Sequence, residues 1–114
     1  MNPSTTKRPW GSFTTFIQNE ECTVKLLYVN SGEELSLQYH DKREEFWKVI
    51  KGNPDIVIGD KTESAHEGDE FFIGRNINHR ISAPEDDVLI LEISKGEFDE
   101  NDIVRLEDKY NRMP

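Results

Sequence analysis

The sequence predicts an all-β barrel or sandwich, and three observations lead to this fold class. Short runs rich in Val, Ile, Leu, Phe and Tyr recur along the 114 residues, and turn-forming residues separate them at even spacing. Only the C-terminal end changes to a helical period. Many short strands with regular turns are typical of sandwiches and barrels. At this length we expect one domain, residues 1–114.

Turn signals and the period of the apolar residues define the expected elements in order. Residues 8–11, Arg-Pro-Trp-Gly, predict an extended entry followed by a turn. At the other end, Ile103, Leu106 and Tyr110 recur at helical spacing after a possible N-cap at Asp99, so we expect a short helix packed outside the barrel. The runs predicted as strands are 12–17, 22–29, 34–39, 45–51, 55–58, 70–73, 79–82 and 88–94.

Composition narrows the possible partners. The net charge is −9, and so acidic a surface repels nucleic acids and anionic membranes, which excludes both as expected partners. No apolar run is long enough to cross a bilayer, and residues 1–7 are too polar for a signal peptide. The single cysteine, Cys22, cannot form an internal disulfide, and we expect it in the core. A soluble cytoplasmic protein is the expectation.

Four side chains from two separate segments form a candidate metal site. Gln38 and His40 are two residues apart, so in a strand they point to the same side. Glu45 has the opposite parity and can join them only if the chain turns at 41–44 and Glu45 begins the next strand. A strand, a tight loop at 74–78 and a further strand would bring His79 to the same interior.

The donor set indicates the chemistry of such a site. Two imidazoles, one carboxylate and one amide oxygen suit one divalent ion, Zn²⁺ first, with Mn²⁺, Fe²⁺, Co²⁺ or Ni²⁺ as alternatives. One or two positions would remain for water or substrate, as a catalytic site requires.

Both segments match the paired sequence motifs of cupins. Glu45 is followed by Gly52 after six residues, and Gly68 leads through residues 74–76 to His79. Further matches are RPWG at 8–11, LSLQYH at 35–40 with Arg43, Glu45 and Trp47, His79-Arg80, and DIVRLEDKY at 102–110 with Arg112. This ordered set resembles the type II mannose-6-phosphate isomerase family, including the isomerase domain of bifunctional mannose-1-phosphate guanylyltransferases.

The resemblance implies a single-domain cupin, a jelly-roll barrel or double-stranded β-helix. It also implies a metal-dependent aldose–ketose isomerase that interconverts mannose 6-phosphate and fructose 6-phosphate by proton transfer through an enediol. By residue match the metal ligands are Gln38, His40, Glu45 and His79, and Arg43 matches the arginine beside the metal. On family analogy we expect a homodimer.

Several residues near the two motifs are candidates for catalysis and substrate binding. Arg43 could stabilise the developing oxyanion, and the proton shuttle could be Glu44, Lys42 or a metal-bound hydroxide. Cations near the ligand segments are candidates for the phosphate, and Trp47 shares the parity of Glu45, which directs it to the interior. The substrate-binding candidates are Arg75, Arg80 and Trp47, with Lys42 and Arg43 as further phosphate candidates.

Two departures from the family pattern leave other functions open. Lys42 and Phe46 stand where the family commonly has histidines. The alternatives are a non-catalytic sugar-binding cupin and another metal-dependent cupin enzyme such as a dioxygenase.

Overall fold

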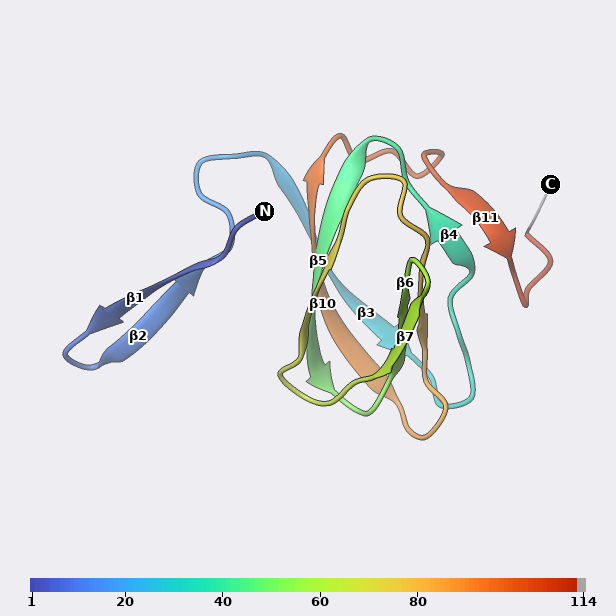
Figure 1. Cartoon of the computed structure of the whole chain (residues 1–114), viewed down its shortest axis with the longest axis horizontal. Helices are drawn as coiled ribbons and strands as arrows, with labels where there is room; N and C mark the ends of the chain where they lie inside the picture. The colour runs from blue at the N-terminus through green and yellow to red at the C-terminus, as the bar shows by residue number, and fades with distance from the viewer. Residues whose placement is uncertain (113–114) are drawn as a thin grey trace.

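The computed structural model describes residues 1–112, which form eleven β-strands and no helix. The all-β prediction is confirmed, and the expected domain 1–114 extends two residues past the described part. Figure 1 shows a barrel-like body with one hairpin standing away from it. Residues 1–112 contain no helix with the length and hydrophobicity needed to cross a bilayer.

Two antiparallel sheets make the body, and a separate hairpin precedes them. The four-stranded sheet has the order β3 (Cys22–Val29), β10 (Val88–Gly96), β5 (Arg43–Lys51) and β8 (Glu70–Ile73). The five-stranded sheet has the order β11 (Val104–Glu107), β4 (Leu37–Tyr39), β9 (His79–Ser82), β6 (Asp55–Ile58) and β7 (Lys61–Ser64). The hairpin consists of β1 (Ser4–Arg8) and β2 (Gly11–Thr15).

The core lies between the two sheets and follows the alternation of strand residues. Trp47 and Val49 of β5 and Ile90 of β10 are buried from one sheet, and Ile56 and Ile81 from the other, all at most 1% exposed. Because successive strand residues face opposite sides, Arg43 and Glu45 share the inward side of β5 with Trp47. β5 thus supplies core residues along its length and two buried charged residues, Arg43 and Glu45, near its start.

The predicted C-terminal helix is wrong. Its central residues form β11, which pairs with β4 through Val104 and Tyr39 and through Arg105 and Gln38. The β-branched pair Ile103-Val104 favours a strand, and the free edge of β4 offers unpaired backbone groups that a helix would not satisfy. Cys22 is also not in the core, because it begins β3 on the outward side and is exposed.

Candidate metal centre

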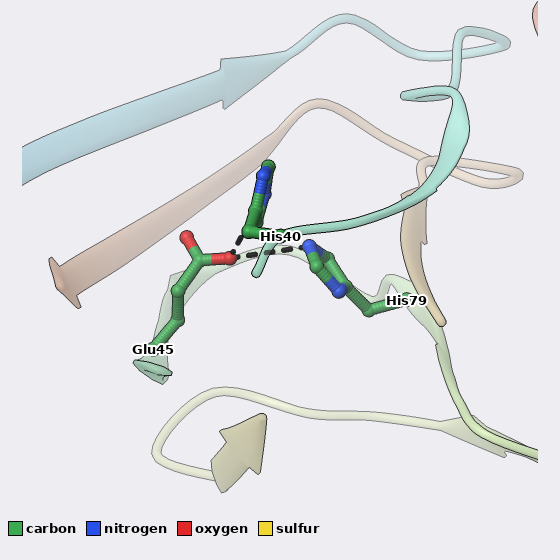
Figure 2. Close-up of side chains that lie close together, drawn as sticks. All are labelled: His40, Glu45 and His79. Carbon is green, nitrogen blue, oxygen red and sulfur yellow. Dashed lines mark ion pairs between the residues drawn. The ribbon is translucent and has the colours of Figure 1, made fainter. Parts of the chain in front are cut away.

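His40, Glu45 and His79 converge at one end of the barrel, between the two sheets. His40 directly follows β4, Glu45 lies near the start of β5, and His79 begins β9. One ligand atom of each residue lies within 4.8 Å of the others, and all three side chains are buried. Figure 2 shows them pointing toward one another, with dashed lines from one Glu45 oxygen to both histidines.

Backbone carbonyls orient both imidazoles. Nδ1 of His40 donates to the carbonyl of Asp102 at 2.7 Å, and Nδ1 of His79 donates to the carbonyl of Ile77 at 2.8 Å. Because each Nδ1 donates to a carbonyl, a ring in its neutral form directs the lone pair of Nε2 inward. The two Nε2 atoms lie 3.3 and 3.1 Å from Oε1 of Glu45. Carbonyl hydrogen bonds of this kind fix metal-ligating histidines in other proteins.

With both rings neutral, two imidazole nitrogens and one carboxylate oxygen face one another as acceptors. Oε1 of Glu45 and Nε2 of His79 are buried and have no hydrogen-bond partner among the described residues. Burial works against the charge of Glu45, but the neighbouring side chains of His40, His79 and Glu92 outweigh it and hold the pKa of Glu45 below its ordinary value. Two imidazole nitrogens and a carboxylate oxygen fit a divalent ion of the zinc, manganese, iron, cobalt or nickel type.

Gln38, the fourth predicted ligand, lies next to this group. It pairs with His79 across β4 and β9, and it lines the same pocket as His40 and Glu45. Its Oε1 accepts a hydrogen bond from Oγ of Ser36 at 2.6 Å. An amide oxygen has a second lone pair, so Gln38 remains the predicted fourth ligand.

A pocket of about 680 Å³ opens over the metal-ligand group. Its wall is rich in cations although the chain is strongly acidic, and it also holds the buried carboxyl of Glu92. The cationic lining residues are Lys25, Arg43, Arg105 and Arg112. Pockets with a few convergent polar groups are the usual place for a small-molecule site.

Arg43 lies beside the metal-ligand group, where the resemblance puts an arginine. Its side chain is buried, its NH2 lies 3.2 Å from Nε2 of His40, and its NH1 donates to the carbonyl of Asp99 at 3.3 Å. The guanidinium also stacks over the ring of Phe98, 4.5 Å from the centroid. This packing holds a fixed positive charge at the inner end of the pocket.

The two candidates for the proton shuttle, Lys42 and Glu44, do not line the pocket. Lys42 lies in the turn before β5 and forms an ion pair with Glu97 at 3.7 Å. Glu44 points to the outer side of the sheet, because its neighbours Arg43 and Glu45 point inward, and it binds the N-terminal ammonium of Met1 at 3.0 Å.

The three substrate-binding candidates are also outside the pocket wall. Arg75 is exposed in the loop before β9, and Arg80 pairs with Glu107 at 3.4 Å on the outside of the barrel. Trp47 is only 1% exposed, and its ring meets that of His79 edge-on at 5.4 Å. Trp47 therefore packs against His79 from the core side of the metal-ligand group.

Glu92, Lys25 and Arg105 are among the pocket residues that are absent from the candidates that the sequence suggested. Glu92 of β10 accepts a hydrogen bond from Nε1 of Trp47, and Lys25 pairs with it across β3. Each is a lone charge within an apolar run and shares parity with core residues, which is a signal the sequence offered. Arg105 lies beside Gln38 on β11, and its place in a supposed helix concealed it.

The electrostatics of Glu92 follow from this position. Burial, a hydrogen bond with Glu45 and the charge of that residue raise the pKa of Glu92 to about 8. Two neighbouring carboxyl groups with pKa values shifted in opposite directions are a feature common in functional sites.

Comparison with known proteins finds related sequences over nearly the whole chain. The family model described as "Mannose-6-phosphate isomerase C-terminal" matches residues 2–108. A mannose-1-phosphate guanylyltransferase of Sinorhizobium fredii is 36% identical over 110 residues, which are 94% of this chain and 22% of that protein. The alginate biosynthesis protein AlgA of Pseudomonas aeruginosa is 37% identical over 107 residues, 92% of this chain and 22% of AlgA. The chain thus spans about a fifth of the length of these relatives.

Solved structures show the same fold. Oxalate decarboxylase from Bacillus subtilis superposes with a TM-score of 0.70 at 25% identity, covering 83% of this chain and 26% of that one. A putative sugar phosphate isomerase from Acidithiobacillus ferrooxidans gives 0.61 at 19% identity, covering 67% and 51% of the two chains. The fold is that of the cupins, and the chain belongs to the mannose-6-phosphate isomerase C-terminal family.

Proposed function

We propose that this chain is a metal-dependent isomerase that interconverts mannose 6-phosphate and fructose 6-phosphate. The observation that carries the proposal is the set of three inward acceptors, His40, Glu45 and His79, next to a pocket with an excess of cations. The family supports the sugar phosphate as substrate, because its description names that reaction.

The chemistry requires removal of a proton from the carbon next to the sugar carbonyl. A bound divalent ion would supply positive charge beside the sugar oxygens, where negative charge develops. Arg43 adds a second fixed positive charge there, because its guanidinium lies within hydrogen-bond distance of His40. Since Phe98 and the carbonyl of Asp99 already hold this guanidinium, it needs no reorganisation during the reaction.

Proton transfer between C2 and C1 needs a group on one face of the open-chain sugar. Glu92 lines the pocket and lies beside Glu45, whereas Glu44 and Lys42 point elsewhere. We therefore assign the proton transfer to the carboxyl of Glu92. Trp47 and Ser94 hold this carboxyl through hydrogen bonds of 3.2 and 3.5 Å.

We assign binding of the phosphate group of the substrate to Lys25 and Arg105. Both line the pocket, and neither has an ion-pair partner among residues 1–112, while Nε of Arg105 is buried without a hydrogen-bond partner. They come from opposite sheets and so can reach one anion from two sides. Charge-assisted hydrogen bonds to phosphate are among the strongest available to a protein.

A coupled assay of mannose 6-phosphate conversion tests the proposal. Protein stripped of metal and reloaded with each candidate ion should turn over with at least one of them, and His79→Ala should lose both metal binding and turnover. Glu92→Gln should keep metal and sugar phosphate binding but lose turnover. Activity that survives both metal removal and His79→Ala contradicts the mechanism.

Two other outcomes would replace the isomerase. Binding of mannose 6-phosphate without turnover under every metal would indicate a non-catalytic sugar-binding cupin. Oxygen uptake by the iron-loaded protein would indicate a dioxygenase.

A further inference from the structure

Residues 97–103 connect β10 in one sheet to β11 in the other and cross one end of the barrel (Figure 1). Gly96, just before them, lets the chain pass very close to the start of β5. Its φ is +118°, and a Cβ there would overlap the carbonyl oxygen of Lys42 and approach Cα of Arg43 to 3.1 Å. The close passage brings the half-buried side chain of Phe98 into the pocket wall.

The ring of Phe98 holds two cations that come from different strands. Nζ of Lys25 on β3 lies 4.1 Å from the ring centroid, and Cζ of Arg43 on β5 lies 4.5 Å from it. Because β10 runs between β3 and β5, these two strands are not paired with each other. The ring therefore joins two parts of the pocket wall that no backbone hydrogen bond connects directly.

An aromatic ring holds a cation without neutralising its charge, whereas a carboxylate would neutralise it. Neither Lys25 nor Arg43 forms an ion pair with a carboxylate among residues 1–112, although the chain contains 23 acidic residues. Nε of Arg43 is also buried and has no hydrogen-bond partner in the same part of the chain. Both side chains thus keep charge and N–H donors for an anion in the pocket.

We infer that Phe98 is a positioning residue that holds Lys25 and Arg43 at a fixed separation, so that one substrate meets both. In the proposed function, on which this inference rests, Lys25 binds the phosphate and Arg43 stabilises the charge that develops at the sugar oxygens. Without the ring, both long side chains gain rotamers that point away from the substrate. The loss should therefore reach both substrate affinity and the chemical step.

Binding of inorganic phosphate to the metal-loaded chain, measured by calorimetry, tests the contribution through Lys25 and requires no turnover. Phe98→Leu should raise the dissociation constant about 2- to 30-fold, whereas Phe98→Tyr keeps a ring and should retain the wild-type affinity. In a Lys25→Met background, Phe98→Leu should change the affinity little. Phe72→Leu is the matched control, because Phe72 is a 42% exposed phenylalanine on β8 that does not line this pocket.

Steady-state kinetics with mannose 6-phosphate test the contribution through Arg43. Lys25→Met alone should raise KM with little change in kcat, whereas Phe98→Leu should raise KM and also lower kcat about 2- to 5-fold. The decrease in kcat should persist in the Lys25→Met background, because it acts through Arg43. Circular dichroism should show that all variants are folded.

The outcomes separate this inference from the proposed function. Coupled effects of Phe98→Leu and Lys25→Met on phosphate binding, in a protein that isomerises no sugar phosphate, would support the positioning role and contradict the proposed function. A wild type that does not bind phosphate, or a Phe98→Leu variant with unchanged phosphate affinity, would overturn the inference. Equal weakening of phosphate binding with and without Lys25 would also overturn it, as would an active Phe98→Leu variant with unchanged kcat.

Discussion

The backbone carbonyl of Asp102 accepts a hydrogen bond from Nδ1 of His40 at 2.7 Å, and the side chain of the same aspartate holds the turn that follows His40. Its two carboxylate oxygens accept hydrogen bonds from the backbone N–H groups of Asp41 and Lys42, each at 2.9 Å. Asp102 therefore fixes both the ring of one proposed ligand and the turn that leads to Glu45. A loop outside the metal-ligand group thus determines its geometry.

Asp102→Ala should weaken metal binding about 10- to 100-fold, the usual effect of removing a residue that orients a ligand. The variant keeps the carbonyl but loses both contacts to the turn. Competition with a chromogenic chelator measures the affinity. Asp99→Ala is the control, because the Asp99 carboxylate accepts only from the N–H of Asn101 in the same loop. Equal affinities of the two variants would contradict the positioning role of Asp102.

Metal should stabilise the wild-type fold and not the Glu45→Gln variant. Ligand at about 100 times its dissociation constant adds about 2.7 kcal/mol to the free energy of unfolding. Without metal, the wild type should be no more stable than Glu45→Gln. The amide of the variant supplies a donor for the facing Nε2 atoms of His40 and His79. Thermal melts with and without Zn²⁺ measure both effects, and an equal zinc response in both proteins would argue against the site.

Lys25→Met and Arg105→Met should each raise KM for mannose 6-phosphate about 10- to 100-fold, since a hydrogen bond to a charged group contributes roughly 1.5–3 kcal/mol. Because phosphate contacts bind substrate and transition state alike, kcat should change little. Arg80→Met is the matched control, since Arg80 pairs with Glu107 outside the pocket. If Arg80→Met raises KM as much as Arg105→Met, the assignment of the phosphate is wrong.

The sequence was informative where one strand determines a contact and less so where several elements meet. Parity along β5 correctly directed Glu45 and Trp47 inward, and the requirement for a turn after His40 is met by residues 41–42. However, β4, which leads to His40, and β5, which carries Glu45, belong to different sheets, although the two residues are close in sequence. Which sheet a short strand joins depends on long-range pairing, which periodicity does not encode.

The same limit explains the errors around the pocket. Arg75 and Arg80 are near His79 in sequence, yet a loop and the strand alternation turn both away from the pocket. Arg105 is distant in sequence but reaches the pocket because β11 pairs with β4. Residues 61–64, which form the exposed strand β7, are not among the runs predicted as strands, because none of the four is apolar enough to give an alternating pattern.

Acid should loosen the C-terminal segment through Glu33. Hydrogen bonds from Tyr110 and Lys109 hold the pKa of Glu33 below its ordinary value of about 4.3. A lowered pKa means that the folded state binds fewer protons than the unfolded state, so the contribution is present above about pH 4.3 and is lost as pH falls through the folded pKa. Hydrogen exchange of residues 104–112 should therefore accelerate in acid in wild type.

Glu33→Gln provides the comparison. The variant cannot titrate at this position, so its exchange at residues 104–112 should already be fast at neutral pH and change less on acidification. Because Arg105 and Arg112 of this segment line the pocket, the variant should also bind mannose 6-phosphate more weakly. A wild-type exchange rate that is independent of pH in this segment, after correction for intrinsic chemistry, would rule out the coupling.

Gly52, the glycine six residues after Glu45 in the first motif, should not tolerate alanine. Its φ is +92°, and a Cβ would overlap the carbonyl oxygen of Asp87 and approach Cα of Val88 to 3.1 Å. Gly32 has a similar φ of +84° but open space around its Cβ position, so Gly32→Ala should cost only the backbone strain of about 1–2 kcal/mol. Gly52→Ala should cost about 1–3 kcal/mol more, because backbone atoms must move. Urea unfolding of both variants measures the difference, and equal losses would mean that the motif glycine is required for its φ alone and not for the close approach of β10.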